Sequence, residues 1–203
     1  MMPKSRMEVF SDGVLAIVIT IMVLELHEPT GASFAALKQV APTFVAYLLS
    51  YAYVGIYWNN HHHLVAALKQ ASGEILWANL FWIFWIFWMS LMPWATQWLG
   101  SHLFATAPTV VYGGVLLMCS LSYYLLQTAV LRQAGRDSAL VALFGRDLKG
   151  KLSVATYLLA TLSGIGWPAV SYLLLTIMAV VWLIPDTRIE RFYQQRATQG
   201  SVK

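Results

Sequence analysis

Charged residues are scarce in this chain of 203 residues, with 11% Asp, Glu, Lys and Arg against 59% hydrophobic residues. Ordinary soluble domains carry about 25% charged residues, so this composition argues against a soluble fold and favours the lipid bilayer as solvent. Cysteine is almost absent as well. The single Cys119 excludes an intramolecular disulfide and lies within an apolar segment, where it is expected to act as a small packing residue.

Long apolar runs dominate what remains. A spanning helix needs roughly 20 residues, and short connections leave room for about six of them. The sequence therefore predicts an all-α, polytopic membrane protein with one domain over residues 1–203 and six transmembrane helices. Their expected ranges are 7–26, 42–63, 75–99, 107–131, 152–165 and 168–184.

Basic residues fall almost entirely on one side of this predicted topology. Of the 13 Lys and Arg residues, only Lys38 lies in a connection on the other side. Cytoplasmic loops are enriched in Lys and Arg, so both termini are predicted to be cytoplasmic. The basic residues lie between apolar runs rather than on one soluble face, so the net charge of +4 does not indicate a nucleic-acid partner.

Asp12 is the unusual residue of the first predicted helix. A carboxylate at the edge of a membrane helix faces a protein interior, water or a partner charge. One interpretation is a favourable interaction with the positive end of the helix, where Glu8 also lies. Arg6 points about 120° away from Asp12 on a helix and cannot pair with it. We therefore expect the partner of Asp12 on another helix.

The end of the second predicted helix is the best source of that partner, because it reads Trp-Asn-Asn-His-His-His from Trp58 to His63. Consecutive histidines diverge by about 100° each on a helix and cannot converge on one metal ion, so no structural metal site is predicted. One interpretation makes these interfacial polar residues. The other packs Trp58 and His61 against the first helix, with Asp12 or Ser11 as polar partner.

Ile17, Ile21 and Leu24 form a narrow apolar stripe on the first helix, with Thr20 beside it. Such a stripe most often serves helix packing. In a symmetric oligomer it would instead form stacked apolar rings, which can gate a pore by dewetting. Residues 53–57 look like a potassium-filter sequence, but they lie in an uninterrupted spanning segment, so no carbonyl filter is predicted.

These residues resemble the bacterial relatives of the lysosomal potassium channel TMEM175. The family signature is an Arg, three residues and then Phe-Ser-Asp, which this chain matches fully. The residues that carry the resemblance are Arg6, Phe10, Ser11, Asp12, Ala16, Ile17 and Thr20 in the first helix, with Trp58, Asn60, His61 and His62 in the second.

The resemblance implies a homotetrameric potassium-permeable channel in the plasma membrane of a bacterium, with no cofactor beyond the permeant K⁺. The first helix would line the pore, with Ile17, Ile21 and Leu24 as the constriction and Thr20 as a hydroxyl ring. The resemblance also implies a polar network that supports this helix. Its residues would be Arg6, Phe10, Ser11, Asp12, Trp58, Asn60, His61 and His62.

Two other classes of function stay open. Intramembrane ionisable groups also mark transporters, so a secondary or proton-coupled carrier using Asp12 and the histidines is the alternative. A non-conducting membrane scaffold is the third class. An enzyme has little support, because no nucleophile with a base appears at usable spacing.

Overall fold

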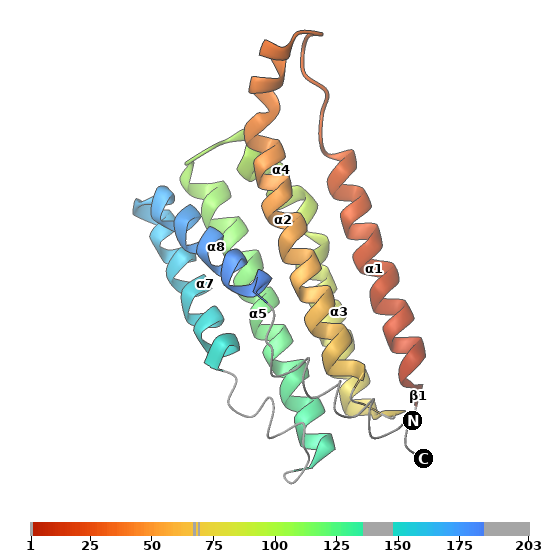
Figure 1. The fold of residues 1–203 in the computed structure, drawn as a ribbon. Helices are drawn as coiled ribbons and strands as arrows, with labels where there is room; N and C mark the ends of the chain where they lie inside the picture. The colour runs from red at the N-terminus through yellow and green to blue at the C-terminus, as the bar shows by residue number, and fades with distance from the viewer. Residues whose placement is uncertain (1, 67, 69, 136–147, 185–203) are drawn as a thin grey trace.

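The computed structural model describes residues 2–66, 68, 70–135 and 148–184, with the side chains of 2, 78 and 80–87 excepted. In these residues the fold is a bundle of seven α-helices and one short strand pair (Figure 1). In chain order the elements are β1 (Met2–Pro3), α1 (Lys4–Leu24), α2 (Phe34–Ala66), β2 (Gln70–Ala71), α3 (Gly73–Ser90), α4 (Met92–Ser101), α5 (Thr106–Ala134), α7 (Leu148–Gly166) and α8 (Pro168–Leu183).

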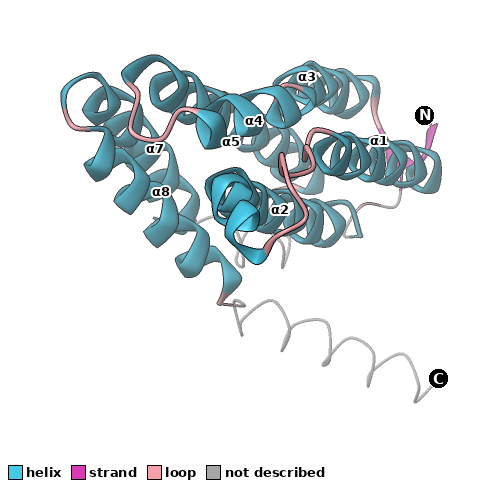
Figure 2. Ribbon diagram, turned by 90° about the horizontal axis from the view of Figure 1, so that it is seen from above, coloured by secondary structure: helices cyan, strands magenta, loops and turns pink. Residues whose placement is uncertain are grey.

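Seen from above, α1 and the α7–α8 pair lie at opposite sides of the bundle, with α2 and α5 between them (Figure 2). Helix α1 contacts α2, α3 and α4, whereas α7 contacts α5 and α8. Among the described helices α1, α2 and α5 are long and apolar enough to cross a membrane, and α8 is a shorter apolar helix. The chain is therefore a helical membrane protein.

Four of the predicted helices match observed ones within a few residues, but the second begins earlier than expected. Proline favours the first turn of a helix, which is why Pro42 marked the predicted start. In the structure α2 begins at Phe34 and Pro42 lies inside it. At 33 residues α2 is about 50 Å long, so its first turns project beyond the end of α1 (Figure 1).

The single helix predicted over 75–99 is divided at Leu91 into α3 and α4. Pro93, at the start of α4, has no backbone N–H to continue the ladder. The Leu91 amide donates to the Trp88 carbonyl, three residues back, at 3.2 Å, as in a tighter turn. The proline therefore accounts for the break.

Helices α5 and α7 approach each other closely at two glycines. A Cβ at Gly113 would lie 2.9 Å from Thr161 Oγ1, and one at Gly164 would lie 3.2 Å from Thr109 Cγ2. Small residues allow membrane helices to pack backbone against backbone, where van der Waals contact provides much of the association energy. These glycines fix the spacing of the α5–α7 pair.

The first residues of the chain are tied to the connection between α2 and α3, which the sequence did not predict. Met2 pairs with Ala71 in an antiparallel bridge, and Lys4 Nζ donates to the Ala66 carbonyl at 2.9 Å. Gln133 Nε2, at the end of α5, donates to the Gln70 carbonyl at 2.8 Å. The start of α1 is thereby anchored to the ends of α2 and α5.

Candidate pore helix and its polar contacts

After Asp12, helix α1 is apolar on all sides except at Thr20, but only one face of the helix is buried against the bundle. That face carries Met7, Ser11, Leu15, Val18 and Met22. Among the described residues, no helix covers the remaining surface of α1.

The predicted constriction residues lie on this uncovered surface. Ile17 is 58% exposed, Ile21 40% and Leu24 76%. Thr20 is exposed between them, and its hydroxyl donates to the Ala16 carbonyl at 2.9 Å, so the oxygen remains able to accept. The structure thus leaves the stripe exposed, and its role as a pore constriction stays a prediction.

Asp12 is held by a residue of α2. Trp58 Nε1 donates to Asp12 Oδ1 at 3.0 Å. The indole also stacks on the His62 ring, with centroids 6.4 Å apart and planes 26° apart. A carboxylate that accepts an N–H forms a charge-assisted hydrogen bond, stronger than a neutral one. The partner of Asp12 thus lies on another helix.

His61 contacts a different helix. Its Nε2 lies 3.3 Å from Asn79 Oδ1 of α3, and both side chains are buried. Asn79 was not singled out from the sequence. The sequence feature that could have identified Asn79 is its amide in an otherwise apolar segment. A polar side chain in hydrocarbon is expected to find a partner on a neighbouring helix.

The other residues predicted for the network make more local contacts. Ser11 Oγ donates to the Met7 carbonyl at 2.9 Å, and Asn60 Nδ2 donates to the Ile56 carbonyl at 2.7 Å. Arg6 and Phe10 are exposed on the surface of α1. The structure therefore joins Asp12, Trp58 and His62 as one chain of contacts, and a network supporting a pore stays a prediction.

The three consecutive histidines diverge, as the helical spacing requires. His61 is buried and His62 is exposed, while the rings of His62 and His63 meet edge to face at 5.7 Å. Within the part of the chain that the structure describes, no three His, Cys, Asp or Glu side chains gather as a metal site.

A hydroxyl cluster in the interior was missed by sequence reasoning. Ser50 Oγ lies 2.7 Å from Thr96 Oγ1 and 2.8 Å from the Tyr112 hydroxyl, which joins α2, α4 and α5. One turn along α2, the Tyr53 hydroxyl donates to the Leu175 carbonyl of α8 at 2.6 Å. Ser, Thr and Tyr are common in membrane helices, and the sequence does not indicate which of their hydroxyls contact one another. The cluster was therefore found only in the structure.

Comparison with known proteins places the chain in a family. The family profile described as endosomal/lysosomal potassium channel TMEM175 matches residues 6–93, which contain both motif segments. A protein of Chryseobacterium sp. (strain P1-3) named as a potassium channel is 46% identical over 193 residues, covering 94% of this chain and 97% of its own. The chain belongs to the TMEM175 family.

Other members show how widely the TMEM175 fold is shared. The rat protein named endosomal/lysosomal proton channel TMEM175 is 32% identical over 60% of this chain, which spans only 26% of that protein. The crystal structure of a homologue of the lysosomal potassium-selective channel TMEM175, from Chamaesiphon minutus, superposes with a TM-score of 0.74 at 22% identity, covering 89% of this chain and 96% of the other. That likeness establishes a TMEM175-like fold for the bundle.

Proposed function

We propose that this TMEM175-family protein is a potassium-permeable cation channel, assembled as a homotetramer in the plasma membrane of a bacterium with both termini cytoplasmic. The observation that carries the proposal is the near full-length match to a relative named as a potassium channel. Residues 53–57, which look like a potassium-filter sequence, lie within the continuous helix α2, which supports a channel that does not use them as a carbonyl filter.

The uncovered face of α1 supports its role as the pore-lining element. At 100° per residue, Ile17, Ile21 and Leu24 lie within about 60° of one another, whereas Asp12 lies about 140° from Ile17. One helix can thus line a pore with its stripe while Asp12 contacts α2. In a tetramer four such stripes would form stacked apolar rings, with Ile17 as the tightest and Thr20 contributing a ring of hydroxyls.

Selectivity in such a pore has to come from size and dehydration. Potassium gives up hydration water more readily than sodium, so a narrow apolar ring flanked by hydroxyls favours potassium only modestly. We therefore expect weaker discrimination between potassium and sodium than a filter of backbone carbonyls provides.

The contacts of the ionisable groups favour a channel over a proton-coupled carrier. Such a carrier would need Asp12 and His61 in one relay. The Asp12 carboxylate instead accepts from Trp58, and His61 pairs with Asn79 of α3. Both contacts join neighbouring helices, as expected of groups that position α1 and α2.

Replacing Ile17 with Asn tests the proposal. The purified protein is placed in liposomes, and single-channel current is recorded with potassium and sodium on opposite sides. A polar ring removes the dewetting barrier, so Ile17→Asn should raise the conductance and lower the preference for potassium. Ile177→Asn makes the same change at an exposed position of α8 and should alter neither quantity.

The outcomes separate the three classes of function. Unitary currents in the wild type exclude a carrier, and no current in any variant favours the scaffold. An unchanged conductance and selectivity in a tetrameric Ile17→Asn variant would show that this face of α1 does not line the pore.

A further inference from the structure

A small cavity lies between α2, α5, α7 and α8, away from α1. Its volume of about 30 Å³ is room for one or two water molecules and for nothing larger. The cavity begins about one helical turn from the close contact of α5 and α7, because Tyr157 in its wall precedes Thr161 by one turn of α7. Bulky Tyr157 thus holds the two helices further apart than the glycines do.

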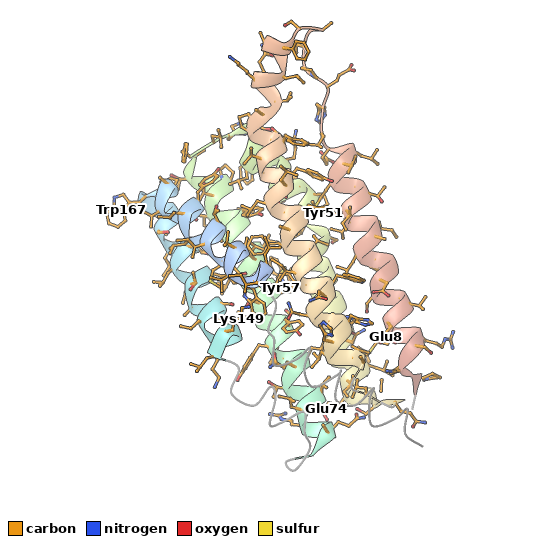
Figure 3. All side chains as sticks on the ribbon, viewed as in Figure 1. Glu8, Tyr51, Tyr57, Glu74, Lys149 and Trp167 are labelled. Atoms are coloured by element: carbon orange, nitrogen blue, oxygen red, sulfur yellow. The ribbon has the colours of Figure 1, made fainter. Side chains whose placement is uncertain are left out.

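The wall of this cavity is polar although it is buried. The polar side chains that α2, α5 and α7 contribute to it are Tyr57, Asn60, Ser120, Gln127, Ser153 and Tyr157. All of them except Asn60 are buried, and Figure 3 shows Tyr57 between the helices. Cavities that stay dry are lined by apolar side chains, whereas a buried water molecule makes about three hydrogen bonds to polar groups. The chemistry of the wall therefore favours water.

Contacts between the wall residues leave part of their hydrogen-bonding capacity unused. The Tyr57 hydroxyl interacts with the side chains of Tyr157 and Ser120. Each hydroxyl donates one hydrogen and accepts two, so these three retain lone pairs that can accept further hydrogens. Asn60 Nδ2 donates to the Ile56 carbonyl of its own helix, which leaves the amide oxygen able to accept as well.

The polar atoms of the wall are also placed where water can meet them. In the described part of the chain, the side-chain atoms that are sealed from water and have no hydrogen-bond partner are Gln97 Oε1 and Ser171 Oγ, and neither residue lines this cavity. Each polar atom of the wall is therefore either paired within the protein or within reach of a water molecule.

We propose that this cavity binds one or two ordered water molecules, which join α2, α5 and α7 through Tyr57, Ser120 and Tyr157. Two water molecules at this point complete hydrogen bonds that the three hydroxyls cannot all make with one another. Bulk water does not compete with such bonds inside a membrane-spanning bundle, so each of them contributes to holding the helices together. An apolar occupant would leave the hydroxyls with unmet hydrogen bonds, which is costly in a buried site.

The water site is independent of the proposed pore. None of the cavity-lining residues belongs to α1. Bound water is detected without ion flux, so the water site can fail while the channel stands, and the reverse.

X-ray radiolysis of the purified full-length protein tests the site, because X-rays convert a bound water molecule into a hydroxyl radical that modifies the nearest aromatic ring. Tyr157 lines the cavity and is 2% exposed. Tyr53 is 0% exposed and does not line the cavity, although its ring centre lies 6.0 Å from that of Tyr157. Mass spectrometry should show that Tyr157 is modified severalfold faster than Tyr53. Equal rates for the two rings would overturn the proposal.

A variant that fills the cavity links the modification to the water. Ser120→Val replaces a hydroxyl of the wall with methyl groups, and the fast modification of Tyr157 should be lost. Ser122→Val is the matched control, because Ser122 is also buried in α5 but does not line the cavity, and its Oγ donates to the Met118 carbonyl of its own helix. This control should leave the rate at Tyr157 unchanged.

Undiminished modification of Tyr157 in a folded Ser120→Val variant would show that the radical does not come from water in the cavity, and would contradict the proposal. If Ser120→Val does not fold, Ser120→Thr adds a single methyl group, keeps the hydroxyl and should slow the modification. The comparison of Tyr157 with Tyr53 in the wild type needs no variant and decides the question by itself.

Discussion

A single indole N–H supplies the contact that Asp12 lacks within its own helix. The bond from Trp58 joins α1 to α2 near their shared end of the bundle. Because a carboxylate accepts hydrogen bonds more strongly than a neutral amide, the contact depends on the charge of Asp12 as well as on its position.

We predict that Asp12→Asn lowers the yield of assembled protein more than it changes ion preference, because a neutral acceptor weakens the bond that positions α1. Asp12→Ala should lower the yield further, since it removes the acceptor. Size-exclusion chromatography measures assembly, and potassium–sodium reversal potentials measure preference. A fully assembled Asp12→Asn variant with altered selectivity would place the carboxylate in the conduction path.

The hydrogen bonds of the Ser50 hydroxyl allow a second test of a single side chain. Ser50→Ala removes two buried hydrogen bonds and leaves Thr96 and Tyr112 without this partner, so it should cost about 1–3 kcal/mol of stability. Ser163→Ala is the matched control, because Ser163 Oγ donates only to a carbonyl of its own helix, that of Ala160. Thermal unfolding in detergent measures both, and equal melting temperatures would contradict the assigned role of the cluster.

The sequence identified the important polar residues more reliably than it identified their hydrogen-bond partners. Asp12 stood out because one carboxylate in an apolar helix is rare, and its position relative to Arg6 left only another helix as source of a partner. Helical spacing put Trp58 and His61 on one face, yet their polar atoms reach α1 and α3 respectively. The rotation of α2 between those two neighbours is decided by packing, which a single sequence does not contain.

Among the helices, the α5–α7 pair shows the tightest dependence on small residues. We predict that Gly113→Ala lowers the melting temperature, because the added methyl would lie 2.9 Å from Thr161 Oγ1 and 3.2 Å from Thr161 Cα, so one helix must shift. Gly114→Ala adds the same methyl to the next residue, where nothing lies within 4 Å, and should leave the melting temperature nearly unchanged. Equal effects of the two variants would show that the close approach does not matter for stability.

The helical class was predictable because each spanning segment must satisfy its own backbone in lipid, whereas the number of six spanning helices stays a prediction: three of the described helices are long and apolar enough to cross a membrane. The ends of the helices were predicted less accurately. Residues 34–41 lie in α2 although they include Lys38 and Gln39, because a helix continues into water when its side chains allow it. The division at Leu91 was missed because the apolar run continues unbroken across Pro93.

Across the whole molecule, the described ends of the helices separate the basic residues. Lys4 and Arg6 begin α1, Arg132 ends α5, and Lys149 begins α7, so they share one end of the bundle, while Lys38 lies at the other (Figure 1). The bundle therefore presents one basic end and one end where Lys38 is accompanied by Glu25 and Glu28.

We predict that the basic end faces the cytoplasm, because cytoplasmic loops retain Lys and Arg. In a Cys119→Ala background, a cysteine at Leu103 should react with a membrane-impermeant maleimide on intact cells, and one at Gln133 should react only after permeabilisation. The connection predicted to be cytoplasmic spans 133–150, of which 136–147 lie outside the described residues. The reverse labelling pattern would show that the topology is the opposite of the predicted one.

The length of α2 has a practical consequence for detecting the protein. Its first turns, with the preceding residues 25–33, stand beyond the end of α1 and include the exposed side chains of Phe34 and Leu37 (Figure 1). On the predicted topology this projection lies on the external face of the membrane. An antibody fragment raised against it would recognise the folded, purified protein, and the number of fragments bound per particle would count its subunits.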